Sequence, residues 1–146
     1  MKKMALILLI ITTFIPVLVG CASRPPSHQE LANADYGPYP ENWQNLIKAR
    51  LKLGLVDPES AQYRFPYGQP FKGWKSVQGD RGEFSSKTIY GWHTCFEYNA
   101  KNRMGGYTGY KQTYVMINKG RIQAFWNDEL TPYVCRDILS QRGAVR

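Results

Sequence analysis

The feature that most restricts the fold of this chain is a run of alternating side chains from Thr88 to Asn99. The aromatic residues Tyr90, Trp92, Phe96 and Tyr98 share one set of alternate positions, and Ile89, Gly91, His93, Cys95 and Glu97 occupy the other. Because successive side chains of a strand point to opposite faces of a sheet, this pattern predicts a long β-strand with one aromatic face. The chain is therefore expected to contain a sheet.

Further strands are predicted on both sides of this run. The candidates are Tyr63–Phe65, Phe71–Trp74, Tyr110–Ile117 and Arg121–Trp126. Asn118-Lys119-Gly120 predicts a hairpin turn between the last two. Phe71–Trp74 lies within a segment from Pro66 to about Ser86 that is rich in Pro, Gly and charged residues, and it is expected to be an edge strand. Together these segments predict an antiparallel sheet of three to five strands.

Two helical segments are predicted before the sheet. Glu41–Leu53 follows a proline, carries apolar residues at near-helical spacing and basic residues near its end, and stops before Gly54. Asp57–Ala61 predicts a second helix of one or two turns with Asp57 as its N-cap. The C-terminal tail is expected to be extended, with a helical turn near residues 136–140. The fold class is therefore α+β, with one long and one short helix packed on the sheet.

Composition and charge limit the function. The 146 residues are 43% hydrophobic and 21% charged, which fits one compact domain and excludes collagen, a coiled coil or a disordered acidic chain. Two His and three Cys are too few for a zinc framework, and no carboxylates fall in a recognisable catalytic motif, so neither a metal, a cofactor nor an enzyme is expected. The net charge is +8, and it would be +6 without residues 1–20, which favours anionic envelope surfaces or an acidic protein partner over nucleic acid, for which no fold signature is present.

The N-terminus has the pattern of an export signal. Met1-Lys2-Lys3 precedes an apolar run from Met4 to Val19, and small residues follow, as is typical of a secretory signal peptide. A transmembrane anchor is the alternative, but the run is slightly short and Pro16 lies near its end. Leu18-Val19-Gly20-Cys21 resembles the lipobox of bacterial lipoproteins.

The lipobox resemblance implies a cellular location for the protein. In such lipoproteins the cysteine is lipidated and the peptide is cut before it, so Cys21 is the expected lipidation site. Ala22 and Ser23 follow it instead of Asp, which implies sorting to the outer membrane. Several acyl chains hold a protein firmly on a membrane without a transmembrane helix. We therefore expect a signal peptide over residues 1–20, a lipidated tether over residues 21–40 and a single α+β domain over residues 41–146.

The two remaining cysteines are expected to form a disulfide. With Cys21 lipidated, Cys95 and Cys135 are left in a compartment where disulfides persist, and their bond would join the long strand to the C-terminal tail. The alternative is a reactive thiol, because His93 and Cys95 share a face of the strand. No Asn or Asp can be assigned to orient His93, which favours the disulfide.

The loop between the two strongest strands, Asn99–Tyr110, allows two interpretations. It lacks the Gly-Lys-Ser/Thr ending of a phosphate loop and no helix is expected after it, which argues against nucleotide binding. It can be a long hairpin loop whose glycines permit positive φ and whose tyrosines pack back on the sheet. It can instead bind a partner protein through Lys101, Arg103, Tyr107 and Tyr110, since Tyr and Arg are favoured at interfaces.

Two motifs resemble a set of small bacterial lipoproteins and secreted domains over about residues 35–125. They are Asp57-Pro58-Glu59-Ser60-Ala61, and Asn99–Asn102 together with Gly105–Tyr110. The resemblance supplies no activity for any residue.

The functional prediction therefore rests mostly on the expected cellular location. We expect a non-enzymatic outer-membrane lipoprotein, facing the periplasm or the cell surface. It would be an accessory or structural subunit of a cell-envelope assembly such as a secretion-system outer-membrane complex, with other envelope proteins as partners. The alternative is a module that binds an envelope ligand: peptidoglycan, lipopolysaccharide or a lysozyme. An enzyme is the third possibility, and neither nucleic acid nor a small-molecule substrate is expected.

Overall fold

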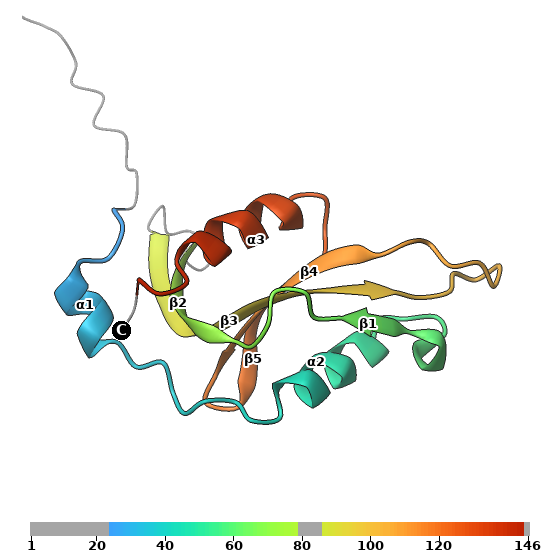
Figure 1. The fold of residues 1–146 in the computed structure, drawn as a ribbon, viewed down its shortest axis with the longest axis horizontal. Helices are drawn as coiled ribbons and strands as arrows, with labels where there is room; N and C mark the ends of the chain where they lie inside the picture. The colour runs from blue at the N-terminus through green and yellow to red at the C-terminus, as the bar shows by residue number, and fades with distance from the viewer. Residues whose placement is uncertain (1–23, 79–85, 145–146) are drawn as a thin grey trace, which may run out of the picture.

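The computed structural model describes residues 24–78 and 86–144, so the predicted signal peptide and Cys21 lie outside the described residues. In chain order the elements are α1 (His28–Asn33), α2 (Trp43–Lys52), the 3-10 helix η1 (Pro58–Ser60), β1 (Gln62–Arg64), β2 (Phe71–Gln78), β3 (Ser86–Asn99), β4 (Lys111–Asn118), β5 (Arg121–Trp126) and α3 (Thr131–Ser140). Figure 1 shows the sheet between α2 on one side and α3 on the other.

The sheet is antiparallel and is built around the long strand β3. β1 and β2 share one edge of β3, with β2 against residues 86–93 and β1 against residues 97–99. β4 pairs with the other edge of β3 and β5 pairs with β4, which gives five strands in all. Lys119 and Gly120 make the β4–β5 turn with φ of 50° and 70°, as a two-residue hairpin turn requires. The α+β prediction is confirmed.

Each face of the sheet packs against one helix. On one face Phe96 and Tyr98 of β3 contact α2 through its buried residues Trp43, Ile47 and Leu51. On the opposite face Cys95 of β3, together with Tyr114 and Met116 of β4, contacts α3 through Cys135 and Ile138. The predicted disulfide is present between Cys95 and Cys135, which are 40 positions apart in the chain. It joins α3 to the centre of the sheet.

The prediction of one long and one short helix is wrong, because α2 and α3 both have 10 residues. The prediction of an extended C-terminal tail with one helical turn is also wrong, because Thr131–Ser140 form the helix α3. Pro132 lies in the first turn of this helix, where proline is tolerated. The side chain of Asp128 accepts hydrogen bonds from the Leu130 N–H at 3.0 Å and the Thr131 hydroxyl at 3.1 Å, which orders the start of α3. Its buried residues Thr131, Cys135 and Ile138 share the face that packs on the sheet.

Part of the segment expected to be a tether is folded. α1 begins with a capping box in which the Ser27 hydroxyl accepts from the Glu30 N–H and the Glu30 carboxylate accepts from the Ser27 N–H. After α1, Tyr39 packs edge to face on Trp92 with ring centroids 5.0 Å apart. The indole N–H of Trp92 donates to the Gly37 carbonyl at 3.0 Å. The chain therefore lies against the sheet before residue 41.

Candidate functional site

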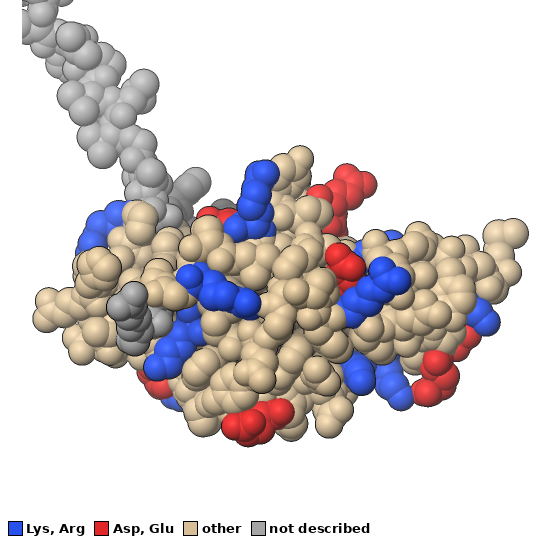
Figure 2. All heavy atoms as spheres, in the orientation of Figure 1, with Lys and Arg blue, Asp and Glu red and all other residues tan. Residues whose placement is uncertain are grey.

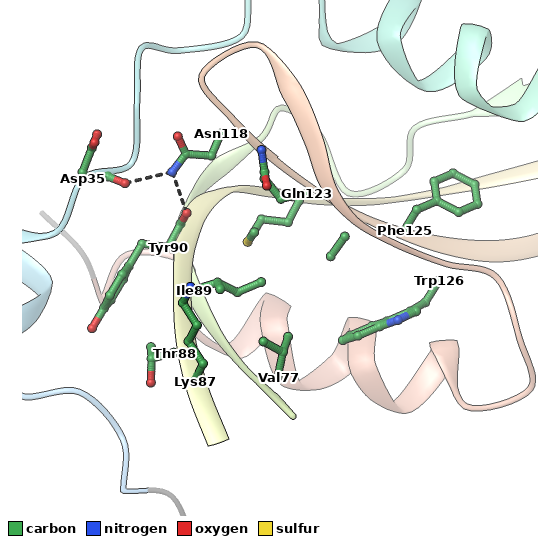
Figure 3. A pocket seen from close by; sticks show the side chains of 12 residues that line it. Asp35, Val77, Lys87, Thr88, Ile89, Tyr90, Asn118, Gln123, Phe125 and Trp126 are labelled. Carbon is green, nitrogen blue, oxygen red and sulfur yellow. Dashed lines mark hydrogen bonds between the residues drawn. The ribbon is translucent and has the colours of Figure 1, made fainter. Parts of the chain in front are cut away.

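A groove opens where β3 and β4 part. β4 pairs with β3 only from Trp92 to Tyr98, whereas β3 begins at Ser86 and continues along β2. We call the paired residues 73–78 and 86–91 the β2–β3 arm, and residues 111–126 the β4–β5 hairpin. At Gly91 the backbone of β3 passes close to β4, because a Cβ there would lie 2.7 Å from the Ile117 carbonyl oxygen. Before Trp92 the two strands no longer pair, and a wedge lies between Ile89 of the arm and Trp126 of the hairpin (Figure 3).

Asn118 closes the narrow end of the wedge. Its side-chain NH₂ donates to the Tyr90 carbonyl at 2.8 Å and to the Asp35 carbonyl at 2.9 Å. These bonds join the β4–β5 hairpin, the arm and the segment after α1 at one point, and Figure 3 draws both of them. Asn118 thus replaces the backbone partner that β4 no longer offers to Tyr90.

The wedge is a groove with an apolar floor and a volume of about 920 Å³. Val77 and Ile89 line it from the arm, and Met116, Ala124 and Trp126 line it from the hairpin. This volume lies within the ~300–1,000 Å³ range of ligand-binding pockets. The disulfide and α3 lie against the same face of the sheet and support this floor.

The rim of the groove is polar. Lys87, Thr88 and Gln123 stand at its border together with Asp35. The Asp35 carboxylate pairs with the Lys119 ammonium at 2.6 Å. Hydrogen bonding from Lys119, and secondarily from the Gly37 N–H, lowers the pKa of Asp35. Asp35 therefore stays ionised next to the groove at neutral pH, and the groove has charged groups of both signs at its border.

A buried histidine lies deeper in the same layer. The imidazole Nδ1 of His93 is 2.7 Å from the Tyr114 hydroxyl, and both side chains are fully buried. Burial lowers the pKa of His93 to about 4, with a smaller contribution in the same direction from the Lys75 charge and an opposing one from the Gly73 backbone. Burial also raises the pKa of Tyr114. The thiol that His93 would have activated is bound in the disulfide, so the reactive-thiol alternative does not describe this structure.

The predicted partner surface is at the other end of β3, in the loop after Asn99. The Tyr107 hydroxyl donates to the Ser60 carbonyl at 3.2 Å, and the Tyr107 ring lies 5.6 Å from the Lys101 ammonium. The Tyr110 ring is covered by the Arg64 guanidinium at 3.6 Å. Tyr110 therefore packs against β1, as the hairpin interpretation anticipates, whereas Tyr107 bonds to η1 through its hydroxyl and its ring stays 46% exposed.

The tip of this loop still projects into solvent. The Asn102 side chain accepts from the backbone N–H groups of Met104 and Gly106 at 2.9 and 3.1 Å and holds the tip in one shape. Met104 is 94% exposed and Arg103 beside it is also exposed. Of the four predicted residues, Lys101 and Tyr110 are thus half-buried, whereas Arg103 at the ordered tip and Tyr107 are exposed.

Charges do not gather into one patch on the face drawn in Figure 2, where Lys and Arg side chains are scattered and Asp and Glu side chains lie between them. Within residues 24–78 and 86–144 no group of three or more His, Cys, Asp or Glu is placed to hold a metal ion. In the same ranges no helix is long and apolar enough to cross a membrane.

The comparisons with known proteins add no relatives: no family model, curated protein or solved structure matches this chain. The fold and the groove therefore define the protein as an α+β domain with a five-stranded antiparallel sheet, in which β3 extends beyond its pairing with β4. The sequence contains one signal for the groove, because an isolated glycine inside a strand pattern often marks a close backbone approach, and Gly91 is that glycine.

Proposed function

We propose that this protein is a non-enzymatic, lipid-anchored outer-membrane protein. It serves as an accessory subunit of a cell-envelope assembly, such as a secretion-system outer-membrane complex, and it binds a partner protein in the groove between the β2–β3 arm and the β4–β5 hairpin. The observation that carries the proposal is the groove itself, which combines an apolar floor with a polar rim on a disulfide-linked sheet. Binding sites are typically built in this way.

The place of Cys21 in the sequence, close before α1, supports this proposal. Arg24 is only three positions after Cys21, a span of at most ~11 Å. α1 follows at once and is held to the domain, since Leu31 is buried and its carbonyl accepts from the Tyr36 hydroxyl at 2.8 Å. A lipid on Cys21 would therefore keep the α1 end of the domain close to the membrane. The loop after β3 lies at the far end of the long axis in Figure 1, so it would point away from the membrane.

A second candidate function is binding of an envelope glycan or lipid. Tyr90, Phe125 and Trp126 all line the groove. Aromatic rings present an apolar face and, in Tyr and Trp, a polar group, which suits a sugar ring or a lipid headgroup as well as a protein. Both candidate functions use the same groove, and they differ only in the chemical class of the bound molecule.

Crosslinking in intact cells tests the proposed function. A photoreactive amino acid replaces Val77 in the groove, Met104 at the loop tip, or the exposed Gln44 on α2 as a control on the other face of the sheet. We expect the Val77 position to give one discrete protein adduct that the Gln44 position does not give. An adduct from Met104 would add the loop with Lys101, Arg103, Tyr107 and Tyr110 as a second contact surface. Adducts at Val77 with glycan or lipid alone would support the second candidate, and no adduct at Val77 would contradict both.

The same cells test the anchor. Cys21→Ser should block lipidation and cleavage together, move the protein out of the membrane fraction and remove the Val77 adduct. If the variant still matures at residue 21 and stays with the membranes, the lipoprotein part of the proposal is wrong.

A further inference from the structure

We propose that the occupant of the groove is an extended segment of the partner protein, which pairs as an added strand with the free edge of β3 at residues 86–90. This inference rests on the proposed function and names the kind of partner that the groove takes. It is carried by the juxtaposition of an unpaired strand edge and an apolar groove that runs beside it.

The backbone of β3 offers the hydrogen bonds for such a strand. The Tyr90 carbonyl accepts from Asn118 of β4, so the backbone groups of Tyr90 face away from β2. Groups on alternate residues of a strand face the same edge, so the N–H and C=O of Thr88 and the N–H of Tyr90 also point there. Among the described strands, none pairs with this edge before Trp92. An incoming segment can therefore continue the ladder that β4 leaves.

The side chains beside this edge suit a segment with alternating character. An added strand would direct every second side chain onto the groove floor, where Ile89, Met116 and Trp126 lie. The side chains between them would point to the opposite face, toward Thr88 and Tyr90. Strand addition of this kind takes its affinity from main-chain bonds and its specificity from the pockets for alternate side chains. Five residues of β3 correspond to ~17 Å of strand, which sets the length of the contact.

Charge favours an acidic partner over a second copy of this chain. Lys87 is exposed at the border of the groove and supplies the positive charge there, because the Lys75 ammonium, 5.7 Å from the Trp126 ring, is already paired with the Asp137 carboxylate at 3.4 Å. The full chain carries a net charge of +8, and removal of residues 1–20 with Lys2 and Lys3 would leave +6, so two mature copies meeting at this edge would bring like charges together. We therefore assign to the occupant apolar side chains at alternate positions and at least one Asp or Glu near Lys87.

The test uses the full-length protein, purified from membranes in detergent, and a displayed library of random linear peptides as the probe. The peptide selected on wild-type protein is then measured against two variants of one residue. Thr88→Pro removes the N–H that faces the free edge, and Thr88→Ala keeps that N–H and removes only the side chain. We expect Thr88→Pro to weaken peptide binding roughly tenfold or more, and Thr88→Ala, which loses only one side chain of the rim, to weaken it much less. Retention of the Cys95–Cys135 bond and of the circular dichroism spectrum checks that both variants are folded.

A second series leaves the protein unchanged. N-methylation of single backbone amides of the peptide should abolish binding at alternate positions and spare it at the positions between them, because only every second amide of a strand faces β3. Four results would overturn the inference: no peptide selected, equal binding to both Thr88 variants, N-methyl effects without a period of two, or an edge-dependent dimer in place of peptide binding. The crosslinking experiment tests the proposed function independently of the peptide experiments. Glycan adducts in cells would contradict a protein partner, whereas a protein adduct without strand-like peptide binding would contradict only the added strand.

Discussion

The two halves of β3 differ in how completely the domain uses them. Residues 92–98 pair with β4 on one edge, residues 97–99 pair with β1 on the other, and both faces are buried under α2 and α3. Residues 86–91 pair with β2 alone among the described strands, and the side chains of residues 87–90 line a groove. One continuous strand thus belongs at one end to the core and at the other to an open edge. A rigid half of this kind can fix the position of a binding half, which needs few contacts of its own.

The largest expected difference between the halves is in packing. Phe96 is fully buried in the core half and its ring lies 5.8 Å from that of Phe65, so Phe96→Ala should lower the free energy of unfolding by about 3–5 kcal/mol. Ile89 is only partly buried in the open half, and Ile89→Ala should cost much less. Urea denaturation of the two variants compares them, and equal costs would contradict the division of β3 into two halves.

The disulfide should contribute almost as much. It closes a loop of 40 positions and links α3 to the core half of β3. The chain-entropy relation gives up to about 4 kcal/mol for a loop of this size. Replacing both Cys95 and Cys135 by Ala should lower the stability by an amount approaching this value. Non-reducing peptide mapping of the wild type should show one crosslinked pair, and two alkylatable thiols in the native protein would contradict it.

The buried histidine makes the stability depend on pH. His93 has a pKa of about 4 in the folded protein against 6.5 ordinarily, so the unfolded chain binds more protons between these values. Stability from His93 is therefore present above pH 6.5 and is lost as the pH falls toward 4, by up to about 3 kcal/mol. Denaturation curves across this range should be steeper in pH for the wild type than for His93→Gln. Parallel curves would show that His93 does not contribute.

The smallest stability effect is expected where the halves meet. Gly91→Ala places a Cβ 2.7 Å from the Ile117 carbonyl oxygen, and forcing these strands apart should cost about 1–3 kcal/mol. Gly106→Ala is the matched control, since the nearest atom to its Cβ is 3.8 Å away. The control should melt close to the wild type. If Gly91→Ala also melted close to the wild type, the close approach of β3 and β4 at Gly91 would be absent in solution.

The sequence predicts the sheet better than the site. Alternation identifies β3, β4 and β5 because their faces differ in hydrophobicity, and Lys119-Gly120 supports the positive φ values of their turn. α3 was missed because its apolar stripe is short and includes Thr131 and Cys135, which are weak indicators of a helix. The groove depends on the register of β3 against β4 and on where the two strands diverge. Long-range pairing of that kind is not encoded in any local pattern except Gly91.

Residue-resolved hydrogen exchange of the backbone amides shows whether β3 has a free edge at residues 86–90. In the free protein the amides of Thr88 and Tyr90 should exchange faster than those of Ile89 and Gly91, which face β2. With the selected peptide bound, the Thr88 and Tyr90 amides should slow markedly while those of Thr94 and Phe96, already paired with β4, stay unchanged. Equal protection of all four arm amides in the free protein, or no slowing at Thr88 and Tyr90 in the complex, would contradict the claim that β3 offers a free edge to a partner strand.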